Sequence, residues 1–303
     1  MIEFQKLAPS QKALYEEHLF AEAPRGCEYS FANLYLWGRQ SVAQLQGCIG
    51  FFSHFYGRSV YPFPIGQGDK EAMIRHYLED AKKRGIPCRI TGITEADKAM
   101  LESRFPGTFR FRSDRDSFDY VYAIDDLADL RGRKYQKKRN HVNKFHTAHP
   151  DCQALPLTRE RIPTAAAMVD TWYARREETG PAGDYMLEKR AISRAFRHFE
   201  ELDMEGLVLM ENGEVLAMTM GSRLSPDTFD IHFEKAREDV DGAYAAINCE
   251  FARYLRLKHP ELRFLDREED MGLEGLRKAK LSYLPHHMTE KYWAYLMEDL
   301  NED

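Results

Sequence analysis

One lysine near the end of the chain, Lys280, is expected on the apolar face of a helix, where a charged side chain needs a partner. Residues 266–285 open on five consecutive charged residues, DREED, and continue as an expected helix over residues 271–281. At 100° per residue, Lys280 falls on the apolar face of that helix. That face carries Leu273, Leu276 and Ala279. Because a buried ammonium without a partner is strongly unfavourable, Lys280 needs either a salt bridge to Glu269 or Asp270, or a bound ligand.

Residues 228–235 are expected to form a strand in which titratable and apolar side chains alternate. Asp230, His232 and Glu234 lie on one face of this strand, and aromatic and aliphatic residues lie on the other. The charged face can hold a general base or accept the ammonium group of a substrate, or it can face solvent. We expect no metal site, because two ligands, His232 and Glu234, do not make a zinc site.

Two more polar residues of this half lie on otherwise apolar surfaces. Lys235 is on the apolar side of the strand, so it needs a partner just as Lys280 does. Asn248 flanks the apolar stripe of an expected helix over residues 243–258. Its amide either hydrogen-bonds into the same cleft as the charged face or is a satisfied amide of the core.

A basic segment connects the two halves of the chain. From Leu130 to Pro150 there is no acidic residue, and seven lysine or arginine residues occur. In helical geometry one stripe contains Lys134, Lys137, Lys138, His141 and Phe145. Clustered cations suit the phosphates of tRNA or an anionic membrane surface, although a charge run can also be a solvated helix between domains. We expect an anion-binding surface made by Lys134, Lys137, Lys138 and Arg139.

The order of expected strands and helices is repeated in the two halves. Each half contains a hairpin, a helix, a strand, a second helix and a last strand, and Asn212–Gly213 is the turn of the second hairpin. The repetition predicts a duplicated α/β (α+β) unit with two mixed sheets and helices on their faces. We place the first domain at 1–129, a basic connector helix at 130–150 and the second domain at 151–303.

Composition is that of a globular protein from a reducing compartment. Of the 303 residues, 43% are hydrophobic and 12% aromatic, and no apolar run approaches the ~20 residues of a membrane span. The first residues lack the apolar core of a signal peptide. The five cysteines are scattered, which favours a reduced cytoplasm over a disulfide or zinc framework. A net charge of −6 argues against general coating of nucleic acid but allows a local basic patch.

Several sequence blocks resemble one bacterial family of uncertain function. The blocks are GRKYQKKRNHVNKF (132–145), HFEKA (232–236), INCEF (247–251), DREEDMGLEGLRKAKLSYLP (266–285), SFANLYLW and RDSFDYVY. They are similar to proteins grouped with the C-terminal domain of phosphatidylglycerol lysyltransferase. The resemblance implies a tandem pair of GNAT-type acyltransferase domains, related also to the Fem peptidyltransferases, and an aminoacyl-tRNA donor. This sequence lacks the membrane-embedded half of the lysyltransferase, so the resemblance does not identify the acceptor.

The usual GNAT cofactor can be tested against two turns of this sequence. Acetyl-CoA pyrophosphate binds a glycine-rich turn at a helix N-terminus. The equivalent turn here, residues 237–243, has valine for the first glycine and three acidic residues, of which Asp241 is the expected N-cap of the next helix. The other turn, residues 64–72, carries Gly66 and Gly68 but also Asp69 at its helix start. We therefore expect no cofactor, with acyl-CoA disfavoured.

The leading hypothesis is an aminoacyltransferase that moves an aminoacyl group from aminoacyl-tRNA to an amine or hydroxyl of a lipid headgroup or peptide. Such a site needs a base for the acceptor proton and cations for the developing oxyanion. We assign the catalytic roles to Glu234 or Glu269 as base or ammonium acceptor and to Lys280 as charge stabiliser. Candidate substrate-binding residues are Asp230, His232, Lys235, Asn248, Arg267, Asp270, Arg277 and Tyr283. The alternatives are an acyl-CoA-dependent N-acyltransferase and a non-catalytic module that binds anions or RNA.

Overall fold

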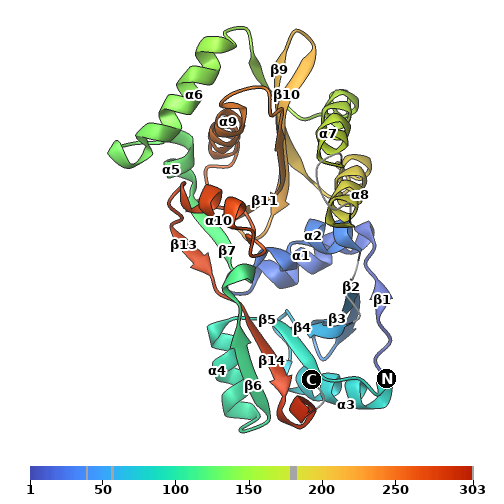
Figure 1. Cartoon of the computed structure of the whole chain (residues 1–303). Helices are drawn as coiled ribbons and strands as arrows, with labels where there is room; N and C mark the ends of the chain where they lie inside the picture. Colours follow the sequence, from blue (N-terminus) through green and yellow to red (C-terminus); the bar gives the residue numbers. More distant parts are fainter. Residues whose placement is uncertain (39, 56–57, 178–182, 302–303) are drawn as a thin grey trace. The chain divides into compact units, whose positions relative to one another are not determined.

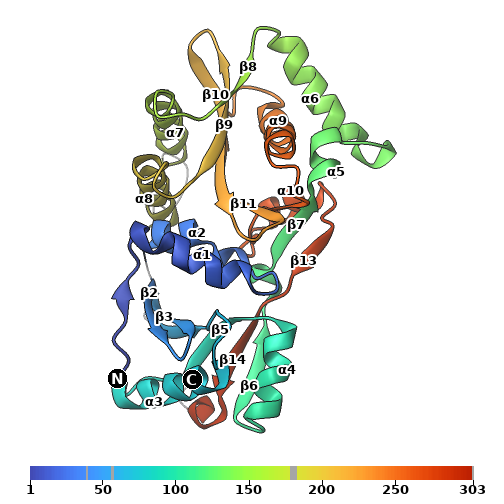
Figure 2. The same cartoon turned by 180° about the vertical axis from the view of Figure 1, so that it is seen from behind.

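Two seven-stranded sheets with helices on their faces make up the fold (Figure 1, Figure 2). The computed structural model describes residues 1–38, 40–55, 58–177 and 183–301. The chain forms two compact units. Unit 1 comprises Met1–Asp119, Glu269–Leu273 and Met288–Asp303, and unit 2 comprises Tyr120–Glu268 and Glu274–His287. The predicted architecture of two mixed sheets is confirmed, while the domain boundaries placed at 129 and 150 stay a prediction.

The sheet of unit 1 takes its strands from both ends of the sequence. Its order is β1-β2-β3-β4-β5-β14-β6. The strands are β1 (Gln5–Lys6), β2 (Gln40–Leu45), β3 (Cys48–Phe55), β4 (Arg58–Pro62), β5 (Arg89–Ile93), β6 (Phe109–Ser113) and β14 (Tyr292–Leu296). Strand β4 is parallel to β5, whereas β14 is antiparallel to both β5 and β6. The last strand of the chain therefore lies inside the sheet that the first residues begin.

Three of the four α-helices described in unit 1 begin after a residue whose side chain caps the first turn. They are α1 (Lys12–Phe20), α2 (Phe31–Trp37), α3 (Lys70–Arg84) and α4 (Glu95–Arg104). Helix α3 begins after Asp69, whose carboxylate accepts a hydrogen bond from the Ala72 N–H at 2.9 Å, and it ends at Gly85 with a φ of 66°. Its fully buried side chains belong to the core of unit 1: Met73, Ile74 and Tyr77.

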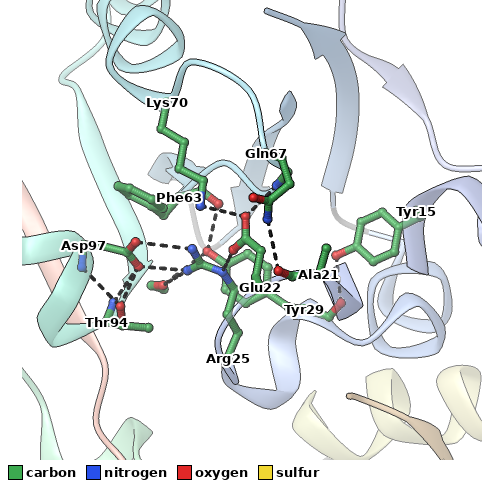
Figure 3. Close-up of polar contacts among 12 residues, drawn as sticks. Tyr15, Ala21, Glu22, Arg25, Tyr29, Phe63, Gln67, Lys70, Thr94 and Asp97 are labelled. Carbon is green, nitrogen blue, oxygen red and sulfur yellow. Dashed lines mark hydrogen bonds and ion pairs between the residues drawn. The ribbon is translucent and has the colours of Figure 1, made fainter. Parts of the chain in front are cut away.

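A buried arginine organises the polar interior of unit 1 (Figure 3). Arg25 is 5% exposed, and its guanidinium pairs with Glu22 (Nε–Oε2 2.7 Å) and Asp97 (Nη1–Oδ2 2.9 Å). Lys70 pairs with the other oxygen of Glu22 at 2.7 Å. The guanidinium also lies over two rings, those of Tyr29 and Phe63. Because each charge of this network meets an opposite charge, we assign it a structural role, which no pattern in the sequence predicted.

The sheet of unit 2 has the order β13-β7-β12-β11-β10-β9-β8. Its strands are β7 (Asp119–Ala123), β8 (Gln153–Pro156), β9 (Glu205–Glu211), β10 (Glu214–Arg223), β11 (Thr228–Ala236), β12 (Phe264–Asp266) and β13 (His287–Thr289). Strand β11 is antiparallel to β10 and parallel to β12. The β9–β10 hairpin turns at the predicted Asn212–Gly213, where φ is 52° and 84°. A bulge shifts the β10–β11 register between Met220 and Gly221.

Helices cover both faces of this second sheet. They are α5 (Ile124–Asp129), α6 (Gln136–Ala148), α7 (Ile162–Glu177), α8 (Gly183–Arg197), α9 (Ala243–Lys258) and α10 (Glu274–Leu281). Helix α9 packs on one face, against β9, β10 and β11, and α7 packs on the opposite face (Figure 1, Figure 2). Helices α5 and α6 pack against α9. No helix within the described ranges is both long and apolar enough to cross a membrane.

The helix predicted over residues 271–281 is shorter than expected. Helix α10 begins at Glu274, because Met271 and Gly272 have left-handed φ values of 52° and 73°. Leu273 is therefore outside the helix and 55% exposed. Ala279 is exposed as well, so the predicted apolar face is wrong, although Lys280 is buried as predicted.

The predicted N-cap of α9 is also wrong. Gly242, with a φ of 83°, is the N-cap residue, and Asp241 instead pairs with Lys144 of α6. A Cβ at Gly242 would lie 2.5 Å from the carbonyl oxygen of His141. The close approach of α6 therefore requires glycine at this position.

Candidate functional site

The three predicted titratable residues of β11 are buried or nearly buried inside unit 2. Asp230 has no exposed surface, and the side chains of His232 and Glu234 are 2% and 11% exposed. The opposite face of the strand is buried too, because helices cover both sides of the sheet. The predicted alternation is wrong at His232, where β11 has one residue more than β10, so Glu234 lies on the same face as Phe229 and both contact α9. The alternative that these charged residues face solvent is wrong as well.

Two neighbouring elements hold the carboxylate of Glu234. Its Oε1 lies 2.9 Å from Nη2 of Arg267, the residue that follows β12. Its Oε2 accepts a hydrogen bond from Nδ2 of Asn248 on α9 at 3.3 Å. Asn248 is 1% exposed, so its amide is a core amide that bonds to the charged face. A charge-assisted pair with so little exposure fixes both side chains more firmly than a surface pair would.

Aromatic rings and a lysine surround the Arg267 guanidinium. The guanidinium lies 5.8 Å from the ring centroid of Tyr122 and 5.1 Å from that of Tyr283. The ammonium of Lys138 on α6 lies 3.6 Å from the Tyr283 ring centroid. Burial, with the neighbouring Arg267 charge, lowers the pKa of Lys138 to about 8. A fraction of Lys138 is therefore a neutral amine near neutral pH.

Lys280 supports the backbone of the same site. Its side chain is buried, and Nζ donates to the carbonyl oxygens of Arg267 (2.5 Å) and Glu268 (3.1 Å). Glu268 has a left-handed φ of 60°, which a residue with a Cβ seldom adopts. Its N–H donates to Oδ1 of Asp266 at 2.8 Å. The ammonium of Lys280 thus stabilises the turn that presents Arg267 to Glu234.

His232 is the centre of a second group, on the face of β11 opposite Glu234. Its Nε2 lies 2.9 Å from the Ser222 Oγ on β10, and its Nδ1 lies 3.3 Å from Asp230 Oδ2 and 3.2 Å from Glu268 Oε1. Ser222 and Glu268 are not among the residues predicted from the sequence. Both lie on or next to strands that flank β11, and the extra residue of β11 at His232 decides which residue of β10 it meets.

Four other residues predicted for the site do not contact the Glu234–Arg267 pair in the described contacts. Lys235, on the opposite face of β11, pairs with Glu188 at 2.8 Å and lies 4.1 Å from the Trp172 ring centroid. Arg277 is half-buried on α10. Glu269 and Asp270 belong to unit 1.

In unit 1, Glu269 belongs to a buried group around Lys291. The Lys291 ammonium lies 2.7 Å from Asp119 and 3.8 Å from Glu269, and the Cys27 Sγ lies 3.3 Å from Glu269 Oε2. Burial raises the pKa of Asp119 against the opposing effect of Lys291. Asp270 lies 3.5 Å from Arg115.

The basic connector forms α6 and the turn before it, and its cations differ in exposure. Lys134 and Lys137 are exposed, whereas Lys138 is half-buried at the site described above. Arg139 donates to the carbonyl oxygens of Leu130 and Gly132, so its guanidinium stabilises the preceding turn. The predicted anion-binding group is therefore divided, and Lys134 and Lys137 remain on the surface.

Close backbone packing explains the glycines in the two turns, residues 64–72 and 237–243, that correspond to a CoA-binding turn. A Cβ at Gly68 would lie 2.0 Å from the carbonyl oxygen of Gln46. The helix start that follows carries the Asp69 carboxylate on its free N–H groups. At the other turn, Arg237 pairs with Asp239 at 2.8 Å. These contacts account for both turns without a phosphate ligand.

Solved structures match nearly the whole chain. A conserved protein of unknown function from Bacteroides thetaiotaomicron is 35% identical, with a TM-score of 0.92 over 98% of this chain and 100% of that chain. L-PGS from Bacillus licheniformis is 16% identical, with a TM-score of 0.71 over 98% of this chain and 94% of that chain.

Two more distant structures show the fold. FemX is 11% identical, with a TM-score of 0.62 over 99% of this chain and 98% of that chain. A tandem GNAT protein from the clavulanic acid biosynthesis pathway is 12% identical, with a TM-score of 0.51 over 97% and 98%. The predicted duplicated GNAT-type fold is confirmed.

Relatives found from the sequence agree with those found from the structure. An uncharacterized protein of Mycoplasmoides gallisepticum is 24% identical over 179 residues, which are 58% of this chain and 55% of that protein, so the chain spans about half the length of this relative. The family described as phosphatidylglycerol lysyltransferase, C-terminal, matches residues 21–295. The chain belongs to this family, as its sequence blocks predict.

Proposed function

We propose that the protein transfers an aminoacyl group from aminoacyl-tRNA to an amine or hydroxyl acceptor. The observation that carries the proposal is the buried Glu234–Arg267 pair, with Asn248 and Lys138 around it. Family membership supports a lysyltransferase-like activity, and the likeness to FemX concerns the fold. The aminoacyl-tRNA donor is inferred from the family resemblance. The sequence blocks that carry this resemblance also contain these four residues.

Each group of this site has a chemical task in such a transfer. The acceptor N or O forms a bond to the ester carbonyl carbon, the C–O bond to the terminal ribose breaks, and the ribose oxygen leaves with a proton. Lys138, in its neutral form, takes the acceptor proton, because its pKa of about 8 suits a base near neutral pH. Glu234 accepts the ammonium group of the aminoacyl moiety, and Arg267 stabilises the oxyanion.

Lys280 is a positioning residue in this proposal. Replacing it with methionine leaves the carbonyl oxygens of Arg267 and Glu268 without its ammonium, which should cost about 1–3 kcal/mol of unfolding free energy. The kcat of transfer should fall about tenfold, because the Arg267 guanidinium is then positioned less precisely. The affinity for tRNA should not change. Denaturant unfolding and a kcat–KM series measure the two effects, and Lys278→Met on the exposed side of α10 is the control. A loss of stability with no change in kcat would leave Lys280 a purely structural role.

The exposed cations of the connector are the proposed contact for tRNA phosphates. Charge reversal at Lys137 and Arg133, both exposed, should weaken tRNA binding and lower the salt dependence of log K by about 1 to 2, since each phosphate contact contributes about 0.7–0.9. Filter binding at several salt concentrations measures this. The matched control reverses Lys82 and Lys83, which are exposed on α3. Equal effects of the two double variants would exclude a specific role for the connector.

The direct test of the proposal is label transfer. Purified protein is incubated with a mixed pool of tRNAs charged with labelled amino acids and an extract of lipids and peptidoglycan precursors. We expect one amino acid to move into one fraction, and uncharged tRNA with free labelled amino acids gives no movement. Labelled acyl-CoA in place of charged tRNA tests the N-acyltransferase alternative. Transfer from acyl-CoA alone, or tRNA binding without transfer, would contradict the proposal.

A further inference from the structure

We propose that one face of the sheet of unit 1 binds single-stranded RNA. This arginine–aromatic face consists of Arg110 and Arg112 of β6 with Trp293 and Tyr295 of β14. All four residues belong to unit 1, and β14 and β6 are neighbours at one end of its sheet (Figure 1). Oligonucleotide binding can be measured without charged tRNA, so this surface does not depend on the proposed transferase activity.

The strand register places the four side chains on one side of the sheet. In the antiparallel pairing of β6 with β14, Arg112 lies opposite Trp293 and Arg110 lies opposite Tyr295. Directly opposed residues share a face, and so do residues two apart in one strand. The alternate residues, such as Ala294, belong to the apolar core on the other side, where α4 also packs. The arginine–aromatic face therefore points away from this core.

The two aromatic rings offer a stacking surface for bases. The ring planes of Trp293 and Tyr295 are nearly parallel, at 15°, and their centroids lie 6.0 Å apart. Both residues are half-buried, so neighbouring groups hold the rings while part of each ring stays exposed. Bases of a single strand stack on such rings with little dependence on sequence, because every base has a π-face.

Two arginine side chains beside the rings supply positive charge. Arg110 and Arg112 are exposed, and neither forms a salt bridge within the described part of the chain. By contrast, Arg104 on the neighbouring helix α4 pairs with Glu71. The Arg112 guanidinium lies 5.4 Å from the Tyr295 ring centroid. Because a guanidinium can stack on an aromatic plane and still donate to a phosphate, both arginines can hold the backbone of a strand whose bases stack on the rings.

Acidic side chains do not neutralise this face. The three strands at this end of the sheet, β5, β14 and β6, read RITGI, YWAYL and FRFRS, without an acidic residue. Beyond the strand ends, the carboxylates of Asp114 and Asp299 each accept a hydrogen bond from a backbone N–H at 2.9 Å. Glu298 is exposed in the segment that follows β14. The face is thus locally basic, although the whole chain carries a net charge of −6.

This combination favours single-stranded RNA over the other anionic partners. Paired bases do not present their faces for stacking, whereas unpaired bases in the loops and ends of RNA do. An anionic membrane is bound by apolar side chains that insert into the lipid interface, and half-buried rings insert little surface. All the cations of β6 are arginines, which suit phosphate and base recognition better than lysines do.

The test is binding of a labelled, unstructured RNA of about twelve nucleotides by the full chain, measured by fluorescence anisotropy at several salt concentrations. Arg110→Glu with Arg112→Glu should weaken binding about tenfold or more and lower the salt slope of log K by about 1 to 1.5, since each contact to a single strand contributes about 0.7. Trp293→Ala should weaken binding about fivefold to a hundredfold, and Trp293→Phe, which keeps a ring, much less. The matched control reverses Lys82 and Lys83, exposed on α3, and should bind like wild type.

Tryptophan fluorescence identifies the surface that the RNA occupies. Stacking of a base should quench the emission of Trp293, and this quenching should be absent in Trp293→Phe although the RNA still binds. The same RNA annealed to its complement, single-stranded DNA of the same sequence and phosphatidylglycerol vesicles are the comparison ligands. We expect the single-stranded RNA to bind most tightly. Circular dichroism verifies that each variant is folded.

Each outcome decides the assignment. If Trp293→Ala does not fold, the double arginine variant decides, because both side chains are exposed. RNA binding that survives this variant but is lost on charge reversal at Arg133 and Lys137 would assign the RNA to the connector and overturn the proposal. Tighter binding of duplex RNA, DNA or vesicles would overturn it as well. Absence of saturable binding would leave Arg110 and Arg112 as charges that keep an edge strand from pairing with another chain.

Discussion

Replacing Arg267 with methionine is expected to reduce aminoacyl transfer about a hundred- to a thousandfold. Arg267 carries the guanidinium that lies 2.9 Å from the buried carboxylate of Glu234. Loss of one preorganised donor at a developing oxyanion costs about 10²–10³ in rate. The same change leaves Glu234 buried beside Asn248 without a cation, so the variant should also lose about 3–5 kcal/mol of unfolding free energy.

A double variant separates the catalytic effect from the stability effect. Glu234→Gln with Arg267→Met replaces both charges by neutral side chains of similar size, which should recover most of the lost stability. It should not recover transfer, because both proposed substrate contacts are gone. Arg263→Met, at an exposed arginine just before β12, is the control and should be close to wild type. Recovery of transfer together with stability would show that the pair has only a structural role.

In unit 1, we expect the largest loss of unfolding free energy when the buried ion pairs of Arg25 are removed. Arg25→Met removes a guanidinium that is 4% exposed in its side chain and pairs with Glu22 and Asp97. Both carboxylates remain buried or nearly so, which should lower the free energy of unfolding by about 3–5 kcal/mol. Denaturant unfolding measures this difference.

The same substitution at an exposed pair provides the control. Arg75 lies 2.7 Å from Glu71 on α3, and its side chain is 58% exposed. Arg75→Met should therefore cost about 0–1 kcal/mol, since solvent screens the pair. Equal losses for Arg25→Met and Arg75→Met would contradict the account of the Arg25 network. Aminoacyl transfer per folded molecule should be unchanged in both variants, since neither residue belongs to the proposed site.

Local sequence patterns predicted the strands and helices of the fold and the charged residues of β11. Asn212–Gly213 identified the hairpin, and alternation identified Asp230, His232 and Glu234 as a charged set but missed the extra residue at His232 that places Glu234 on the other face. These signals work because strand alternation and two-residue turns depend on neighbours in the sequence.

Partners that lie far apart in the sequence could not be predicted in the same way. Arg267 meets Glu234 through the parallel pairing of β11 with β12, and no local pattern specifies the register of two strands joined by a helix. Ser222 meets His232 because β11 has one extra residue there relative to β10. Lys280 was predicted to be buried from a helical phase that included Leu273, but the helix begins only at Glu274. Two of its contacts are backbone carbonyl oxygens, which no sequence pattern specifies.

A single-turnover experiment tests the central proposal most directly. Wild-type protein in excess over one labelled aminoacyl-tRNA is mixed with the acceptor fraction, and both the aminoacyl ester and the acceptor product are followed with time. We expect product to appear at the rate at which the ester disappears. Arg267→Met should bind the same tRNA and leave the ester intact. Loss of ester without product, or equal rates in wild type and Arg267→Met, would contradict the proposed aminoacyl transfer at the Glu234–Arg267 site.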